Sequence, residues 1–188
     1  MIDGLFVFEN FYNNPDEVRN HALSLEMSVQ GNYPGSRTES LEKNQRENLK
    51  NFFEKHIIRR PITYWPSEYN TAYQYTTAQD TTWIHHDDTT WAGVLYLTPN
   101  APVESGTGIY RHKESGICLW DRFNDKTDYN SHEDSYDLSK WDCILSIGNV
   151  YNRLVVYQGA YYHRSILPGF GTDKNNGRLF QTFFFNTE

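Results

Sequence analysis

The sequence Ala92-Gly93-Val94-Leu95-Tyr96-Leu97 is a short apolar run that is followed at once by turn residues. A run of this length, with β-branched and aromatic side chains and turn residues at its ends, predicts a β-strand. Runs of the same kind recur on both sides of it, at residues 73–76, 108–110, 144–147, 153–157 and 178–185. So many short strands, which we expect to pair antiparallel, favour a β-sandwich or a jelly roll.

The first third of the chain has a different pattern. Residues 5–8 predict a short strand, and Asn14 followed by Pro15 predicts the start of a helix that ends near residue 26. Apolar side chains spaced three and four apart predict a second helix over residues 41–58. Four of these side chains should face a sheet, namely Leu49, Phe52, Phe53 and Ile57. Helices that precede strands indicate an α+β protein that is mainly β.

Length and composition limit the classes of protein to consider. A chain of 188 residues suits one domain, which we divide into a helical N-terminal part, residues 1–66, and a β-core, residues 71–188. Aromatic residues make up 16% of the chain, and cores built from rings favour strands. The net charge of −7 makes long nucleic acid an unlikely main partner.

The sequence shows no targeting or membrane segment. The N-terminus lacks a basic region followed by an apolar run, and no stretch approaches ~18 consecutive apolar residues. We therefore expect a cytoplasmic protein with no membrane association. Cys118 and Cys143 are too few for a disulfide framework, so we expect two free, mostly buried thiols.

Two connections between the strands are notable. Residues 121–137 contain six acidic residues and few aliphatic ones, which predicts an exposed loop or flap. Gly148-Asn149 lies between two expected strands and predicts a tight hairpin turn.

The densest polar cluster is His85-His86-Asp87-Asp88, and a further histidine, His163, follows late in the chain. Two imidazoles and one carboxylate on one side of a metal form the facial triad of non-haem iron(II) oxygenases. Residues two apart in a strand point to the same face. His85 can therefore act with Asp87, or His86 with Asp88, and parity alone does not choose between them. Taken singly, the tetrapeptide also fits a polar turn, and His163 fits a hydrogen-bonded core histidine.

Arg178 lies 15 residues after His163, at the start of a strongly apolar strand. A cation in such a strand is costly unless it is paired. A guanidinium there is suited to bidentate binding of a carboxylate, although a local acidic residue could also pair with it.

Together these residues resemble the motif of the 2-oxoglutarate- and iron(II)-dependent dioxygenases. The neighbouring segments are similar to a prolyl-hydroxylase-like branch of that superfamily, and the similarity covers most of the chain. The segments that carry it are Trp83 to Asp87, Trp91 to Asn100, Gly106 to Gly108, Asn176 to Leu179 and Tyr33 to Arg37.

The resemblance implies a double-stranded β-helix, a jelly-roll or cupin-like core, with the N-terminal helices packed on it. It implies iron(II) held by His85, Asp87 and His163, and it favours this register over the shifted pair. It also implies 2-oxoglutarate bound through Arg178. Many relatives carry Arg-x-Ser, whereas this chain has Phe180 in place of the serine. A hydroxyl that assists Arg178 must then come from elsewhere, and the candidates are Tyr73, Tyr75 and Tyr96.

The implied activity is hydroxylation of a substrate by dioxygen, with succinate and carbon dioxide as co-products. We expect the substrate to be a small molecule or a side chain of a peptide or protein, and a homodimer is possible. One alternative is a cupin-like metalloprotein with another activity, which would not need Arg178. Another is a binding module that keeps the fold without turnover.

Overall fold

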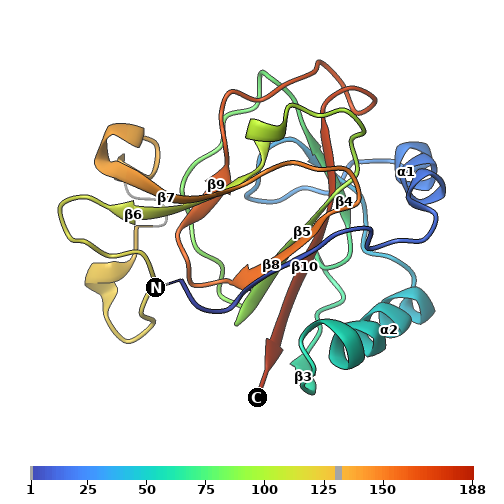
Figure 1. The fold of residues 1–188 in the computed structure, drawn as a ribbon, viewed down its shortest axis with the longest axis horizontal. Coiled ribbons are helices and arrows are strands. Elements are labelled where there is room, and N and C mark those ends of the chain that lie inside the picture. The colour runs from blue at the N-terminus through green and yellow to red at the C-terminus, as the bar shows by residue number, and fades with distance from the viewer. Residues whose placement is uncertain (1, 130–132) are drawn as a thin grey trace.

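The computed structural model describes residues 2–129 and 133–188, which form two antiparallel sheets with two helices beside the larger one (Figure 1). The larger sheet has the strand order β1-β8-β5-β10-β4-β2, and β3 pairs with β10 beside this path. In that order the strands are Leu5–Phe8, Leu154–Gln158, Trp91–Tyr96, Arg178–Thr187, Tyr73–Thr76 and Ser36–Arg37, with β3 at Ile62–Tyr64. The smaller sheet has the order β7-β6-β9, from Trp141–Ile147, Thr107–His112 and His163–Ser165. The mainly β jelly roll predicted from the sequence is confirmed.

Alternation along the strands gives the larger sheet two different faces. On β10, Arg178 and Phe180 line a cavity on the inner face, whereas Leu179 and Phe183 belong to the core on the outer face. The space between the two sheets is filled by a second apolar cluster to which both sheets contribute, namely Ala92, Tyr96, Ile109, Ile147, Val155, Tyr157 and Tyr161. The inner face therefore carries both the apolar filling and the polar cavity.

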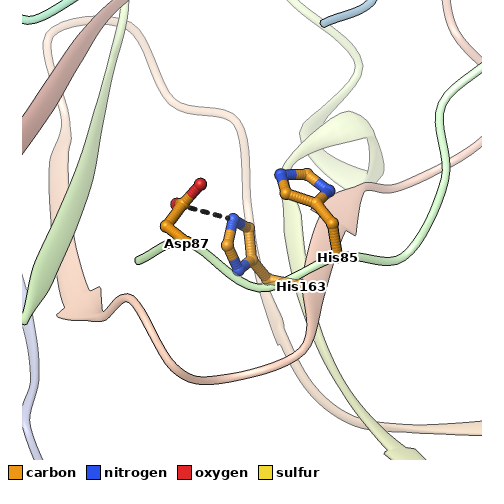
Figure 2. Close-up of side chains that lie close together, drawn as sticks. All are labelled: His85, Asp87 and His163. Carbon is orange, nitrogen blue, oxygen red and sulfur yellow. Dashed lines mark ion pairs between the residues drawn. The ribbon is translucent and has the colours of Figure 1, made fainter. Parts of the chain in front are cut away.

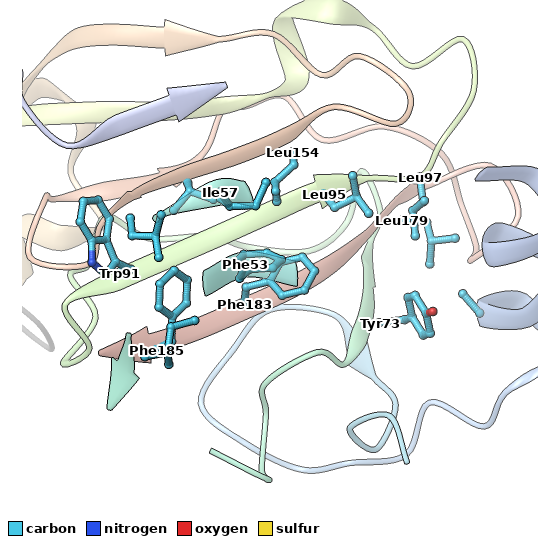
Figure 3. Packing of buried hydrophobic residues seen from close by; sticks show 14 residues of the cluster. Phe53, Ile57, Tyr73, Trp91, Leu95, Leu97, Leu154, Leu179, Phe183 and Phe185 are labelled. Carbon is cyan, nitrogen blue, oxygen red and sulfur yellow. The ribbon is translucent and has the colours of Figure 1, made fainter. Parts of the chain in front are cut away.

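The N-terminal helices cover the outer face. Helix α1 (Pro15–Ser24) is followed by α2 (Lys43–Phe52), which continues directly into a π-helical turn at Phe53–Ile57. Phe53 is fully buried and contacts the rings of Phe183 and Phe185 on β10 (Figure 3). This packing fixes the sheet whose other face holds the cavity.

The helix boundaries and one core assignment differ from the sequence prediction. Helix α1 ends at Ser24, and the second helix starts at Lys43 rather than at residue 41. Phe52 was predicted to face the sheet, but its side chain is 40% exposed and touches Phe11 at the edge of the core. Adjacent helical residues are about 100° apart, so Phe52 and Phe53 do not both face the centre of the sheet.

Gly148-Asn149 does not form the predicted hairpin. Strand β7, which precedes it, belongs to the smaller sheet, whereas β8, which follows, pairs with β1 and β5 in the larger one. The backbone amide of Asn149 donates to the Val103 carbonyl at 2.8 Å, and this hydrogen bond holds the chain where it crosses between the sheets. A turn sequence shows where the chain bends but not which strand it joins next.

The acidic segment 121–137 is only partly exposed. It contains 3-10 turns at Asp125–Thr127 and Glu133–Ser135, and Thr127 and Ser135 are buried. Residues 130–132, which include His132, lie outside the described residues. The prediction of an exposed loop therefore holds for parts of this segment, such as Phe123, and not for all of it.

Within residues 2–129 and 133–188, no helix has the length and apolar character needed to cross a bilayer. Cys118 and Cys143 are free thiols, as predicted, but the expectation that they are mostly buried is wrong, because Cys118 is half-buried and Cys143 is exposed.

Candidate functional site

His85 and His163 face each other across an antiparallel bridge at the start of β9. The His85 amide donates to the His163 carbonyl at 3.0 Å, and the His163 amide donates to the His85 carbonyl at 2.8 Å. Two residues that exchange both backbone hydrogen bonds lie directly opposite each other, with their side chains on one face. The ring centroids are 4.4 Å apart.

Asp87 joins the two histidines because it lies two residues after His85. The Asp87 amide donates to the Gly159 carbonyl at 2.8 Å, which keeps this segment extended beside its neighbour. The Asp87 Oδ2 atom is 3.3 Å from the His163 Nε2 atom (Figure 2). One ligand atom from each of His85, Asp87 and His163 lies within 4.8 Å of the others.

Backbone carbonyls orient both imidazole rings. The Nδ1 atom of His85 is 3.1 Å from the Trp83 carbonyl oxygen, and that of His163 is 2.7 Å from the Tyr161 carbonyl oxygen. A ring that donates its Nδ1–H group to a carbonyl has its Nε2 lone pair available for a metal. In both cases the carbonyl comes from the residue two positions earlier, so each strand segment orients its own histidine.

The pKa values match a ligand set that is ready to bind a cation. Burial, with a smaller contribution from His163, lowers the pKa of His85 to about 4, so its imidazole is neutral at pH 7. Burial alone would raise the pKa of Asp87, but the adjacent His163 and His85 bring it below its ordinary value. A neutral imidazole and an ionised carboxylate are the protonation states that metals require.

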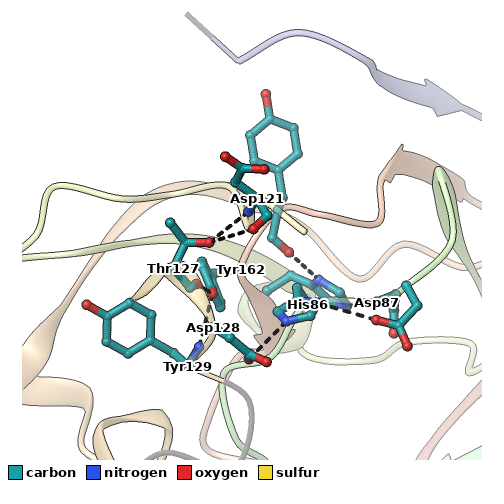
Figure 4. Close-up of polar contacts among 10 residues, drawn as sticks. His86, Asp87, Asp121, Thr127, Asp128, Tyr129 and Tyr162 are labelled. Carbon is teal, nitrogen blue, oxygen red and sulfur yellow. Dashed lines mark hydrogen bonds and ion pairs between the residues drawn. The ribbon is translucent and has the colours of Figure 1, made fainter. Parts of the chain in front are cut away.

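His86 points away from the other three side chains. Its ring stacks on Trp120 at a centroid distance of 4.1 Å. Its Nε2 atom is 3.2 Å from the Asp128 carboxylate (Figure 4). The Asp88 side chain is 88% exposed. The structure thus brings His85, Asp87 and His163 together and leaves the alternative pair, His86 and Asp88, outside this group.

The three side chains line a cavity of about 350 Å³ between the two sheets. Its walls include Arg178, Phe180 and Thr182 from β10, and Tyr157 from β8. The ring of Tyr157 is 4.7 Å from that of His163, centroid to centroid. The cavity extends to the β2–β4 edge of the larger sheet, where its walls are Tyr33, Pro34, Arg37, Tyr69 and Gln74.

Arg178 is only 4% exposed, and no carboxylate of the described residues forms an ion pair with it. Its Nη1 atom donates to the Ser165 hydroxyl, and its Nη2 atom lies 3.3 Å from the Thr107 hydroxyl. Its Nε–H group is buried and has no hydrogen-bond partner in the described part of the chain. Burial lowers the pKa of Arg178, and Tyr96 opposes this shift. An arginine that is buried without a carboxylate is suited to an anionic ligand.

Of the three tyrosines expected to place a hydroxyl beside Arg178, the structure brings only Tyr96 there. Tyr73 and Tyr75 pack in or against the outer core, because they alternate with Gln74, which lines the cavity. The structure therefore does not bring these two tyrosines to the site. Tyr96 lies beneath Arg178, with the guanidinium carbon 5.4 Å from its ring centroid.

Sequence reasoning missed Ser165 and Thr107. Ser165 is two residues after His163 on the same short strand, so strand parity could have placed its hydroxyl next to the ligands. Thr107 is on β6, and its hydroxyl is 2.7 Å from that of Tyr96. Nothing in the local sequence of Thr107 marks it as a neighbour of Arg178.

Two facing antiparallel sheets, with a His-x-Asp pair and a distant histidine between them, define a double-stranded β-helix fold. Solved structures with this fold are similar to the chain. HygX from Streptomyces hygroscopicus, bound to nickel, 2-oxoglutarate and hygromycin B, is 10% identical with a TM-score of 0.58, over 97% of this chain and 82% of HygX. A prolyl hydroxylase from Trichoplax adhaerens, in complex with a hypoxia-inducible-factor peptide, is 12% identical with a TM-score of 0.57, over 97% and 84% of the two chains. The α-ketoglutarate-dependent epimerase SnoN from nogalamycin biosynthesis is 13% identical with a TM-score of 0.55, over 97% and 78%.

The chain belongs to the family DUF6445, described as a family of unknown function, which matches residues 3–185. A comparison with curated proteins finds no significant match. At 10–13% identity the solved structures establish the fold, and the chemistry must be argued from the residues of this chain.

Proposed function

We propose that this protein is an iron(II)- and 2-oxoglutarate-dependent oxygenase. The observation that carries the proposal is a single cavity lined by His85, Asp87, His163 and the buried Arg178. A metal site alone would need only the first three. Arg178 adds a second binding point, for an anion, inside the same cavity.

The ligand set fits iron(II). His85 and His163 offer imidazole nitrogens and Asp87 offers a carboxylate oxygen, which is the donor set of the facial triad. Neighbouring ligands about 2.1 Å from a metal are about 3 Å apart, and His163 Nε2 and Asp87 Oδ2 are 3.3 Å apart. When bound, iron(II) with 2-oxoglutarate would supply the activation of dioxygen that oxidises the substrate.

Arg178 would hold the carboxylate of 2-oxoglutarate that does not bind the metal. Its buried Nε–H group lacks a partner, and an incoming carboxylate would provide one. Ser165 and Thr107 hold the guanidinium in place, and both hydroxyls can also donate to a bound carboxylate. The two anchors would fix the co-substrate in one orientation.

Apolar rings surround these polar groups. Phe180 lies against Arg178, at 4.7 Å from the guanidinium carbon to the ring centroid, and Tyr157 lies against His163. Such walls exclude water and strengthen the electrostatic interactions of the bound carboxylate.

The neighbours in fold support this assignment. HygX structures contain nickel with 2-oxoglutarate, or iron. Hygromycin B is bound in one HygX structure, and a peptide in the prolyl hydroxylase. By analogy the substrate here is a small molecule or a peptide or protein side chain, its product is hydroxylated, and succinate and carbon dioxide are released.

The test is succinate formation from 2-oxoglutarate by the iron(II)-loaded protein in air. We expect succinate at a rate above that of the metal-free protein and of a His163→Ala variant, because both lack the bound metal. Anaerobic titration of 2-oxoglutarate into the iron(II) form should give a visible charge-transfer band. Metal binding without either signal would instead identify a cupin-like metalloprotein with another activity.

A further inference from the structure

The end of the cavity at the β2–β4 edge contains a second buried arginine. Arg37 on β2 pairs in register with Gln74 on β4, so both side chains lie on the same face of the sheet. Arg37 is 6% exposed and lines the same cavity as the three candidate metal ligands.

Arg37 is held rigidly. Its Nε atom donates to the Gln74 Oε1 atom at 2.9 Å, and its Nη2 atom donates to the same oxygen. The Gln74 amide nitrogen donates to the Pro34 carbonyl at 2.6 Å, which turns the amide oxygen toward Arg37. The guanidinium carbon is 3.9 Å from the ring centroid of Tyr33 and 5.8 Å from that of Tyr69. Hydrogen bonds and cation–π contacts thus fix the orientation of the charge.

The charge of Arg37 has no counter-ion among residues 2–129 and 133–188. No carboxylate there forms an ion pair with it, and the hydrogen bonds of its Nε and Nη2 atoms both go to the neutral amide of Gln74. Burial lowers the pKa of Arg37 to about 10, so it is charged at pH 7. Arg37 and Asp87 line the same cavity, and the charge of Asp87 partly opposes this lowering of the pKa. A buried cation without an anion is costly, which suggests that a ligand supplies the anion.

The proposed cofactors do not supply that anion. Asp87 and the two carboxylates of 2-oxoglutarate offset the charges of the metal and Arg178. Arg37 would remain as an uncompensated positive charge in the cavity.

We propose that Arg37 binds a carboxylate group of the substrate and so selects a small acidic compound for oxidation beside the metal. This inference rests on the proposed function, because it takes the metal and Arg178 as occupied by 2-oxoglutarate. The cavity of about 350 Å³ is at the small end for ligand pockets, so beside the co-substrate it suits a small group. Tyr33 and Tyr69 would flank the carboxylate with their rings.

The test compares acids with their amides. The probes are propionate, benzoate and L-alanine, each paired with its primary amide. Each probe is added to the zinc(II)-loaded protein with saturating 2-oxoglutarate, and binding is measured by saturation-transfer NMR. At least one acid should bind about tenfold or more tightly than its amide, since a charge-assisted pair is lost in the amide. This comparison needs no variant. Failure of all three acids to bind, or equal binding of acids and amides, would overturn the proposal.

Variants test whether Arg37 causes the preference for the acid over its amide. Arg37→Gln should abolish the preference for the acid, and Arg37→Lys should restore it in part because a point charge replaces a fork. Arg153→Gln is the matched control, because it removes the same charge from a residue that pairs with Glu9 outside the cavity. It should keep the preference, and circular dichroism should show that all three variants are folded. An Arg37→Gln variant that still prefers the acid contradicts the proposal.

Titration of 2-oxoglutarate into the zinc(II)-loaded wild-type protein, Arg37→Gln and Arg178→Gln separates the proposed function from the inference about the substrate. If the wild-type protein does not bind 2-oxoglutarate, the proposed function fails, and the inference that rests on it fails too. If Arg37→Gln loses as much 2-oxoglutarate affinity as Arg178→Gln, Arg37 belongs to the co-substrate site and only the inference about the substrate is overturned.

Discussion

His85 and His86 are adjacent, yet only one of them faces the cavity. Ile84 and His86 are buried on one side of this extended segment, and His85 and Asp87 lie on the other. The sequence offered both registers, and the choice between them depends on the bridge that places His85 opposite His163. Strand parity is therefore enough to propose two ligand pairs, but a long-range partner is needed to select one.

The first prediction tests this register. His85→Ala, Asp87→Ala and His163→Ala should each weaken binding of iron(II) or zinc(II) by about 100-fold or more, since each removes a ligand. The matched neighbours His86→Ala and Asp88→Ala should keep affinity within a few-fold. Titration of the metal into the five variants measures the difference. Loss of binding in His86→Ala and Asp88→Ala, with binding kept in their neighbours, would show that the register is off by one.

The second prediction concerns Arg178. In Arg178→Ala, metal affinity should stay nearly unchanged, whereas 2-oxoglutarate affinity should fall about 100-fold because a buried carboxylate loses its charged donors. Arg178→Lys should recover only part of the loss. Isothermal titration of 2-oxoglutarate into the metal-loaded proteins provides the measurement. Unchanged affinity in Arg178→Ala would exclude this residue from the site and favour the cupin-like alternative.

At the scale of elements, β10 joins the site to the helices. Its residues alternate between the cavity, with Arg178 and Phe180, and the outer core, with Leu179 and Phe183. The sequence of β10 predicted a strand and a costly cation within it. Thr107 could not be predicted as a neighbour of that cation, because it comes from a strand of the other sheet and its local sequence does not mark it.

The third prediction separates Phe53 from Phe52. Phe53→Ala should lower the free energy of unfolding by about 3–5 kcal/mol, because it leaves a cavity between the π-helical turn at Phe53–Ile57 and β10. Phe52→Ala should cost only about 1 kcal/mol, because its side chain is 40% exposed. Urea unfolding followed by circular dichroism gives both values, and similar losses for the two variants would contradict the packing described here.

At the scale of the whole molecule, the fold class could be predicted from the number of short strands, while the order of the strands could not. Alternating apolar residues specify that a strand has a buried face, but they do not specify its partner. The turn at Gly148 illustrates this, since a hairpin and a crossing between sheets need the same kind of residues. Tyr73 and Tyr75 are a second example. The sequence shows that they share one face of β4, but only the structure shows that this is the outer face, because Gln74 between them lines the cavity.

The last prediction uses the stability of the whole protein as the readout of its site. A ligand that binds only the folded state stabilises it by about 2.7 kcal/mol at 100 times its Kd. For a chain of this length that corresponds to a rise of about 5–10 °C in the melting temperature. Zinc(II) should produce such a rise, and a chelator should reverse it. 2-Oxoglutarate should add a further rise only when the metal is present, since one end of it binds the metal. Phe53→Ala should melt at a lower temperature but keep both increments, whereas His85→Ala should lose both. A rise with 2-oxoglutarate in the chelated protein would show that the anion binds without the metal, which the arrangement of the three ligands and Arg178 does not predict.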